Sequence, residues 1–316
     1  MAGQAPARQA ALKAGLEIST PCTTVNKVCA SGMKSIMLAA SSIALGHQDV
    51  ICAGGMESMS NVPFYLPRKE PSYGGVKLVD AIVHDGLWDV YNQFHMGNCG
   101  ENTAKVQQIT REQQDEYAAM SYERSQNAAK KGIFDKEIVP VVIESKKSNT
   151  TVDKDEEYAR VDLSKFPKLK PAFVKESGTI TAANASTLND GAAAAILSSA
   201  DFAHKHSLKP LAKIIAYADG ACKPIDFPIA PVLAINKLLK MTGVKTSEVD
   251  IWEINEAFSV VALANIKLLN LDKEKHVRSS NNKHVGAASG EGTKGSGGNL
   301  QWRRRSLGHN GRGSLI

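Results

Sequence analysis

Cys29 is the side chain in this sequence best suited to covalent chemistry. A β-branched stretch precedes it, and the apolar side chains after it, from Met33 to Ala44, recur every three or four residues as on a helix. A thiol at the start of a helix lies against unpaired backbone N–H groups and the positive end of the helix dipole. Both favour the thiolate, which is the nucleophilic form of cysteine. A buried structural cysteine is the alternative, and position alone does not decide between the two.

The residues around Cys29 and several later segments resemble motifs of the thiolase family. The first motif is Asn-Lys-Val-Cys-Ala-Ser-Gly at residues 26–32. The others follow in the family's order: Ala-Gly-Gly-Met-Glu-Ser-Met-Ser at 53–60, His-Met-Gly at 95–97, Glu-Asn-Thr-Ala at 101–104, Ala-Ala-Asn-Ala-Ser at 182–186, Asn-Asp-Gly-Ala-Ala at 189–193 and Asn-Glu-Ala-Phe at 255–258. The resemblance runs from about Gly3 to about Val277 and is nearest to the mitochondrial type.

The resemblance implies acyl transfer between coenzyme A thioesters, with a carbon–carbon bond formed or cleaved between acetyl-CoA and acetoacetyl-CoA or its 2-methyl form. Cys29 would carry the acyl group, and Asn255 would hold a water in an oxyanion hole. Residues 249–254 alternate like a strand, so Asn255 follows a strand end, where α/β sites form. Without the resemblance, an Asn that closes a turn would be the more common explanation.

The resemblance also implies a set of binding residues. Arg160 and Lys165 suit the phosphates of coenzyme A, although a solvated charged loop would explain them equally well without the resemblance. His95 is also the kind of residue that is often a hydrogen-bonded core histidine. The coenzyme A and acyl contacts map to Tyr122, Arg160, Val161, Asp162, Lys165, Ser186, His95, Met96 and Phe227. The ligands of a potassium ion map to Tyr122 and to the backbone carbonyls of Ala182, Ala183 and Ala185.

Strand-like and helix-like segments alternate, which predicts an α/β fold with largely parallel sheets. Strands are expected at 49–53, 137–143, 211–217 and 249–254, helices at 111–131 and 231–242, and an exposed excursion at 144–165. The resemblance implies two similar α/β halves with an inserted loop domain. Its segments would be 1–63 for the first half without its first strand, 64–175 for the loop domain, 176–277 for an incomplete second half and 278–316 for a Gly-rich basic tail.

The tail departs from the family pattern. The family's Gly-His-Pro and Cys-x-Gly-Gly-Gly motifs are not found after Val277. Because their histidine and cysteine activate the nucleophile and move the Cα proton in the family, we expect no turnover from the chain as written. Residues 300–305 can be encoded so that a one-nucleotide shift gives Cys-Asn-Gly-Gly-Gly-Gly. We therefore interpret the tail as the product of a frameshift or mis-splicing.

Other functions remain open from the sequence. A non-catalytic interaction subunit that joins intact subunits is the main alternative. Ketoacyl synthases share the fold and the cysteine before a helix, but Asn-Glu-Ala-Phe at 255–258 favours a thiolase. A basic tail that binds acidic partners is a third possibility.

The amino-acid composition restricts the classes of partner that this chain is expected to bind. The net charge is +6, and Lys and Arg after Val277 outnumber the single acid there, Glu291, by six, so the rest of the chain is neutral and does not indicate a nucleic-acid partner. We expect no membrane partner either, because the chain has no run of about 18 apolar residues. The 5 cysteines lack a disulfide or zinc pattern and suit a reducing compartment. The resemblance implies a homo-oligomer (dimer or tetramer) in mitochondria, although no transit peptide is visible and a cytoplasmic location is otherwise expected.

Overall fold

The structure is a computed structural model that describes residues 3–68, 73–271, 277–278, 301–304 and 314–315. Helices are α1 (Pro6–Lys13), α2 (Ser31–Ala44), α3 (Met96–Gln107), α4 (Arg111–Lys130), α5 (Glu157–Arg160), α6 (Ala200–Lys205), α7 (Ala230–Thr242) and α8 (Ser259–Leu268). The longer strands are β1 (Val50–Ser58), β8 (Asp190–Ser198), β9 (Val249–Glu253) and β11 (Gln301–Arg304). The shorter strands are β2 (Phe64–Tyr65), β3 (Val79–Asp80), β4 (Trp88–Asp89), β5 (Phe94–His95), β6 (Val141–Ile143), β7 (Thr150–Val152), β10 (Val277–Arg278) and β12 (Ser314–Leu315).

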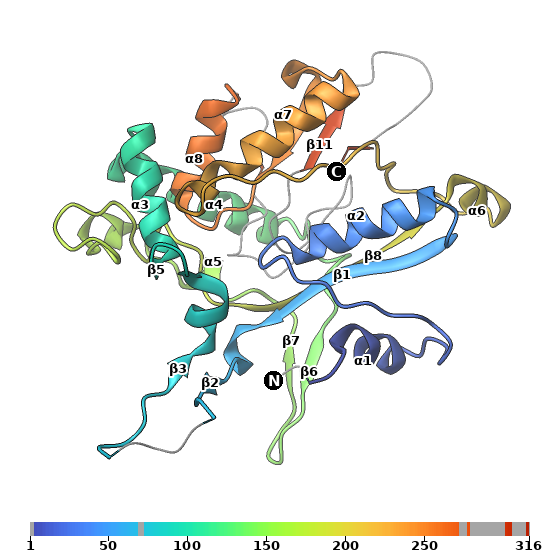
Figure 1. Cartoon of the computed structure of the whole chain (residues 1–316), viewed down its shortest axis with the longest axis horizontal. Helices are drawn as coiled ribbons and strands as arrows, with labels where there is room; N and C mark the ends of the chain where they lie inside the picture. The colour runs from blue at the N-terminus through green and yellow to red at the C-terminus, as the bar shows by residue number, and fades with distance from the viewer. Residues whose placement is uncertain (1–2, 69–72, 272–276, 279–300, 305–313, 316) are drawn as a thin grey trace.

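One layer is built from α2 and the β1–β8 pair. The two strands are antiparallel along their whole length, from Val50 opposite Ser198 to Ser58 opposite Asp190. Figure 1 shows α2 lying along this pair, with its N-terminal end toward the middle of the molecule and its other end toward α6. The helix buries its apolar stripe there, because side chains spaced by three and four residues share one helix face. The small core between helix and strands consists of Ile36, Ala39, Ala53 and Leu197.

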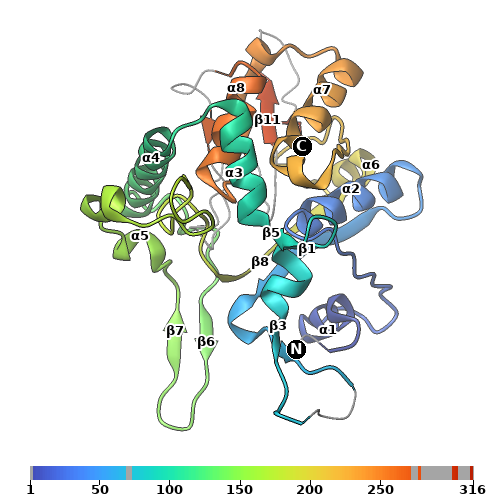
Figure 2. The same cartoon turned by 60° about the vertical axis from the view of Figure 1, so that its left-hand side comes forward.

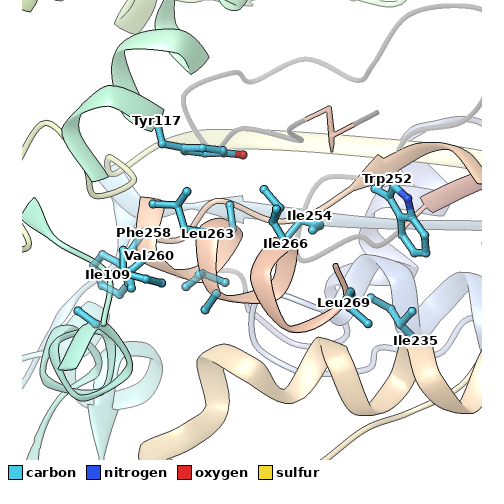
Figure 3. Close-up of a cluster of buried hydrophobic side chains, with 14 of the residues drawn as sticks. Ile109, Tyr117, Ile235, Trp252, Ile254, Phe258, Val260, Leu263, Ile266 and Leu269 are labelled. Atoms are coloured by element: carbon cyan, nitrogen blue, oxygen red, sulfur yellow. The ribbon is translucent and has the colours of Figure 1, made fainter. Parts of the chain in front are cut away.

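A much larger core surrounds α8. This helix is apolar on all sides, and such a helix must be covered on all sides. Helices α3, α4 and α7 pack against it, and β9 leads into it. Figure 3 shows Val260, Leu263 and Ile266 of α8 within this cluster, with Trp252 of β9 and Ile235 of α7 at one end. The segment between β9 and α8 is therefore fixed by both flanking elements.

Local sequence signals set the ends of two helices. Helix α4 begins with a capping box, in which the Gln113 N–H donates to the Thr110 hydroxyl over 3.3 Å and the Gln113 side chain accepts from the Thr110 N–H over 2.9 Å. Helix α7 ends at Gly243, whose φ of 70° is the left-handed conformation typical of helix C-termini. The expected helices at 111–131 and 231–242 are both confirmed, as is the strand that ends near residue 254.

Three strand expectations were wrong in part or in full. The first strand does not end at Gly54 but continues to Ser58, because a Cβ at Gly54 would lie 2.3 Å from the Ala193 oxygen and the glycine permits close pairing with β8. It is also largely exposed, since α2 covers only one face. At 137–143 only Val141–Ile143 forms a strand, and residues 211–217 are in no strand. Residues 144–165 are mostly exposed as expected but contain β7 and α5.

The expectation of largely parallel sheets was also wrong for the strands that are described. Only β9 and β10 pair in parallel, whereas β1 with β8 and β9 with β11 are antiparallel. The remaining pairs are short and antiparallel, and Figure 2 shows the β6–β7 hairpin projecting away from the helices. Apart from β10, β11 and β12, the predicted tail at 278–316 lies outside the described residues. Within the described part of the chain, no helix has the length and apolar character needed to cross a bilayer.

Candidate active site

Cys29 lies in a tight turn immediately before α2, which we call the Cys29 turn (residues 26–31). Val28 has a φ of 50°, a left-handed conformation that is a genuine outlier for a β-branched residue. The Val28 N–H donates to Asn26 Oδ1 over 2.8 Å, and the Ser31 hydroxyl donates to the Val28 carbonyl over 2.7 Å. The Ser31 hydroxyl in turn accepts from the Lys27 N–H over 2.8 Å. The expected position of Cys29 at the start of a helix is thus confirmed, and the turn presents it as an exposed residue.

The electrostatics of the thiol differ from the sequence expectation. The protein groups around the Cys29 sulfur displace water and raise its pKa, the negative charge of Glu57 raises it further, and the Cys29 backbone N–H lowers it. Because the upward effects dominate, the expectation of a favoured thiolate is contradicted. The residue surface is accessible to solvent, but the thiol is protonated at neutral pH. Such a thiol needs a base before it can attack a carbonyl carbon.

Two lysines connect this region to a later part of the chain. Lys34 on α2 forms a 2.6 Å ion pair with Asp219, and Lys27 in the Cys29 turn pairs with the same carboxylate. Hydrogen bonds from these two ammonium groups lower the pKa of the Asp219 carboxyl. All three side chains are partly exposed, so these ion pairs orient the turn more than they stabilise the fold.

Asn255 lies half-buried in the segment between β9 and α8, which we call the Asn255 loop (residues 254–258). The Ser186 N–H donates to the Ala257 carbonyl over 2.9 Å, and the Ser259 N–H donates to the Asn184 carbonyl over 2.8 Å. The Asn255 loop therefore runs beside residues 184–186. The structure brings together two of the sequence motifs, and with them Asn255, Ser186 and Ala185.

A row of aromatic rings joins His95 to the same place. The His95 ring stacks on Phe173 with centroids 4.8 Å apart, and Phe173 meets Phe258 edge to face at 6.0 Å. His95 Nδ1 accepts from the Gly97 N–H over 3.0 Å and caps α3, where Met96 is the first residue. A Cβ at Gly97 would lie 2.2 Å from the Phe173 ring, so a larger residue there would have to displace that ring. Burial lowers the pKa of His95 and keeps its ring neutral, as this hydrogen bond requires.

Tyr122 and Ala183 share a separate buried cluster with Val161 packed against it. The Tyr122 hydroxyl donates to Glu157 over 3.1 Å. Burial and the Glu157 charge raise the Tyr122 pKa, so the phenol stays protonated. A neutral phenol oxygen and backbone carbonyls are hard oxygen donors and suit a hard cation such as potassium. Among the described residues there is no group of three or more His, Cys, Asp or Glu side chains that could hold a metal ion.

Asn184 and Glu101 shape this part of the site, and our reading of the sequence did not single out their roles. Asn184 is 1% exposed; its side-chain oxygen accepts from the Thr181 N–H over 2.8 Å and its amide donates to Asp115 over 2.8 Å. Glu101 accepts from the N–H groups of Thr179 and Ile180, each over 2.9 Å. Both residues lie within motifs quoted from the sequence, so the signal was present, but their partners lie elsewhere and become known only from the fold.

The remaining expected contacts are placed near the surface. Arg160 pairs with Glu156, and Lys165 lies 3.2 Å from Asp162. These side chains are exposed, and their recorded ion pairs stay within their own segment. Phe227 is half-buried in the short 3₁₀ helix Pro224–Ile229, which packs on α3.

Comparison with known families identifies the class of protein to which this fold and these motifs belong. The family model described as "Thiolase, N-terminal domain" matches residues 1–201, and the model described as "Thiolase, C-terminal domain" matches residues 208–289. The chain belongs to the thiolase family. The resemblance and the thiolase-like α/β fold expected from the sequence are thereby confirmed.

Individual relatives are similar over most of this chain. It is 62% identical over 274 residues to a Danio rerio protein named acetyl-CoA acetyltransferase, mitochondrial, with 86% of this chain and 65% of the relative aligned. A Mus musculus protein of the same name is 61% identical over 288 residues, covering 91% of this chain and 67% of the relative. The chain thus spans about two thirds of the length of these relatives.

A solved structure also supports membership of the thiolase family. The Acat5 thiolase from Ascaris suum, solved in complex with coenzyme A, matches with a TM-score of 0.83 and 46% identity. The match covers 92% of this chain and 75% of the Ascaris suum chain. At this level of identity the similarity extends beyond the fold.

Proposed function

We propose that this chain acts as an acetyl-CoA acetyltransferase of the thiolase type, with Cys29 as the acyl acceptor. The observation that carries the proposal is the exposed Cys29 in a strained turn at the start of α2, within the region matched by the thiolase N-terminal family model. The names of the Danio rerio and Mus musculus relatives support the choice of acetyl-CoA as substrate.

The first half-reaction would load the enzyme. The Cys29 sulfur attacks the thioester carbonyl carbon of acetyl-CoA, a new carbon–sulfur bond forms, and coenzyme A leaves with the proton that Cys29 gave up. A raised thiol pKa makes a general base necessary for this step, because the neutral thiol is a poor nucleophile. The Cys29 N–H is a candidate donor to the developing oxyanion.

The second half-reaction would form the carbon–carbon bond. A second acetyl-CoA loses a Cα proton, its carbanion attacks the acetyl carbon on Cys29, and the carbon–sulfur bond breaks to return Cys29 and release acetoacetyl-CoA. Asn255 would hold a water that donates to the thioester oxygen where charge develops. Its half-buried position beside residues 184–186 supports this role. A 2-methyl branch on the acyl chain would be accommodated near Phe227.

Coenzyme A binding is proposed for the residues that map to the family's contacts. Exposed Arg160 and Lys165 can swing toward phosphate oxygens because their present partners hold them only by exposed ion pairs. Tyr122, Val161, Asp162 and Ser186 would line the same site, and His95 with Met96 would lie near the acyl group.

Three further proposals rest on the family. A potassium ion would bind to the Tyr122 oxygen and the carbonyls of Ala182, Ala183 and Ala185, and the placement of Tyr122 and Ala183 in one cluster supports this. Such an ion would supply fixed positive charge near the coenzyme A site. A mitochondrial location and a homo-oligomer (dimer or tetramer) stay predictions, testable by fractionation and light scattering.

Mass spectrometry tests the proposal. The purified chain is incubated with acetyl-CoA and its intact mass and peptides are analysed. We expect an acetyl adduct on Cys29 that is lost in Cys29→Ser and kept in Cys52→Ser, where Cys52 is another exposed cysteine. A folded chain that forms no adduct would contradict the proposal and favour the interaction-subunit alternative.

The two half-reactions can be separated in the same experiment. Acetoacetyl-CoA cleavage over many turnovers requires both of them, whereas the adduct requires only the first. Sustained cleavage would show that the chain completes both half-reactions, whereas an adduct without turnover would limit it to the first.

A further inference from the structure

We propose that Asn26 and Ser31 are positioning residues that hold Val28 in its left-handed conformation and thereby set where the Cys29 thiol lies. This inference deepens the proposed function, because it concerns the residue that would accept the acyl group. Asn26 and Ser31 act through Val28 and need not touch a substrate.

The conformation of Val28 demands an explanation. Its φ of 50° lies in a region that β-branched residues avoid, and such residues persist only where their surroundings hold them. The side chain is 57% exposed and belongs to none of the hydrophobic clusters, so burial of the Val28 side chain does not hold it.

Side chains hold both peptide groups of Val28. Asn26 Oδ1 accepts from its N–H over 2.8 Å, and the Ser31 hydroxyl donates to its carbonyl over 2.7 Å. The Ser31 hydroxyl also accepts from the Lys27 N–H over 2.8 Å, which closes the turn from the other side. Backbone bonds from Ala30 to the Lys27 carbonyl and from Ser31 to the Val28 carbonyl, each 3.1 Å, complete the turn.

Cys29 is the next residue in the chain, so a change in the Val28 backbone moves it directly. Helix α2 fixes the chain from Ser31 onward, and its first core side chain is Ile36. Between Asn26 and Ser31 the structure shows no buried anchor of comparable strength, since these residues are exposed or only partly buried. The position of the thiol therefore depends on contacts local to the turn, and the two side-chain contacts to Val28 act directly on its strained residue.

The test is the rate at which iodoacetamide alkylates Cys29 in the full chain, followed by peptide mass spectrometry across a range of pH. Exposed Cys52 and Cys222 serve as internal references. In Asn26→Ala and Ser31→Ala we expect Cys29 to react about fivefold faster near neutral pH, the effect of losing one hydrogen bond, with both references unchanged. The reason is that the thiol leaves the surroundings that keep it protonated.

Two sets of variants separate positioning from general folding. Ser31→Thr keeps the hydroxyl without changing the charge near the thiol, so its alkylation rate should match the wild type. Val28→Gly adopts a positive φ without strain, so adding it to Asn26→Ala or Ser31→Ala should return the rate to within about twofold of the wild type. An unchanged rate in both alanine variants, or a changed rate that Val28→Gly does not restore, overturns the proposal.

Repeating the experiment with acetyl-CoA in place of iodoacetamide distinguishes a failure of this inference from a failure of the proposed function. If wild-type Cys29 is not acetylated but the alkylation results come out as expected, the acyl-transfer proposal fails and the positioning role stands. If wild-type Cys29 is acetylated, Asn26→Ala should be acetylated more slowly even though it is alkylated faster. A partly unfolded chain could give the same pair of changes but would also expose buried Cys99, so an unalkylated Cys99 shows that the effect is local.

Discussion

The Asn255 loop and the Cys29 turn are held by different means. The Asn255 loop lies between β9 and α8 in the largest hydrophobic core of the described chain, where Trp252 is 2% exposed and Val260 fully buried. The Cys29 turn lies at the end of a thin layer with a small core of Ile36, Ala39, Ala53 and Leu197. Its shape comes from side-chain hydrogen bonds within residues 26–31.

The difference shows how one chain can combine rigid and adjustable segments. Packing in a dense core fixes a loop by many small contacts, so few single changes at the surface move it. A turn fixed by a few hydrogen bonds can be released by a single substitution. Substitutions that alter one region at a time separate the two, and those in the dense core should cost the most stability.

Removing volume from the large core around α8 should have the largest effect. Ile235 on α7 is fully buried, and Ile235→Ala should lower the free energy of unfolding by about 2–5 kcal/mol, because it loses apolar burial and leaves a cavity. Leu233, on the same helix but 46% exposed, is the matched control, and Leu233→Ala should change it by less than about 0.5 kcal/mol. Urea unfolding followed by circular dichroism measures both. Equal losses would contradict the placement of α7.

Removing the buried amide of Asn184 should come next. Asn184→Ala leaves the Thr181 N–H and an Asp115 oxygen without partners, and we expect a loss of about 1–3 kcal/mol in unfolding free energy. Exposed Asn127 on α4 provides the control, for which Asn127→Ala should be near neutral. Because residues 182–186 carry the proposed potassium ligands, the loss should be accompanied by weaker stabilisation by added potassium chloride relative to sodium chloride. A potassium response equal to that of the wild type would argue against this site.

Removing the capping box of α4, a helix that packs against the larger core, should lower the free energy of unfolding by a smaller amount. Thr110→Ala removes the oxygen that caps the Gln113 N–H, and should cost about 1 kcal/mol of unfolding free energy. Thr110→Ser keeps the oxygen and should restore most of it. Thermal unfolding of the three proteins side by side provides the measurement, and a serine variant as unstable as the alanine variant would show that the cap does not act as described.

The smallest effect should come from the ion pairs that join the Cys29 turn to Asp219. Because Lys27 and Lys34 lower the pKa of the Asp219 carboxyl, the folded state gains stability above its ordinary value near 3.8 and loses that gain as the pH falls through the lowered pKa. Asp219→Asn should therefore cost less than about 1 kcal/mol at pH 7, since the groups are exposed. The difference between wild type and variant should shrink as the pH falls below 3.8 and vanish once the pH is below the lowered pKa of the Asp219 carboxyl. If the two proteins still differ in unfolding free energy in acid, Asp219 stabilises the fold through packing and not through its charge.

The sequence predicted the parts of the site that follow from local patterns. The helix after Cys29, the capped α4 and the glycine end of α7 each depend on periodicity or on one capping residue. The strand length at Gly54 was missed because a glycine that ends a strand and one that permits close pairing look alike until the partner, Ala193, is known.

The electrostatics of the site were less predictable. The raised pKa of Cys29 depends on protein groups that surround the thiol only after folding, among them Glu57, 28 positions later in the sequence. Residues 211–217 have a strand-like composition, but a strand needs a partner, and they pair with none of the described strands. Contacts between residues far apart in the sequence determine both the Cys29 pKa and the absence of a strand at 211–217, and patterns in a single sequence do not reveal such contacts.

Native-state hydrogen exchange tests the contrast between the two regions most directly. We predict that the Lys27 and Val28 amides, bonded to the Ser31 and Asn26 side chains, exchange through local opening of the turn, while the α8 amides exchange only on global unfolding. In Ile235→Ala the α8 amides should then exchange faster, with the Lys27 and Val28 amides unchanged. If the turn and α8 are equally protected in the wild type and respond equally to Ile235→Ala, the Cys29 turn is held by the core and the account is wrong.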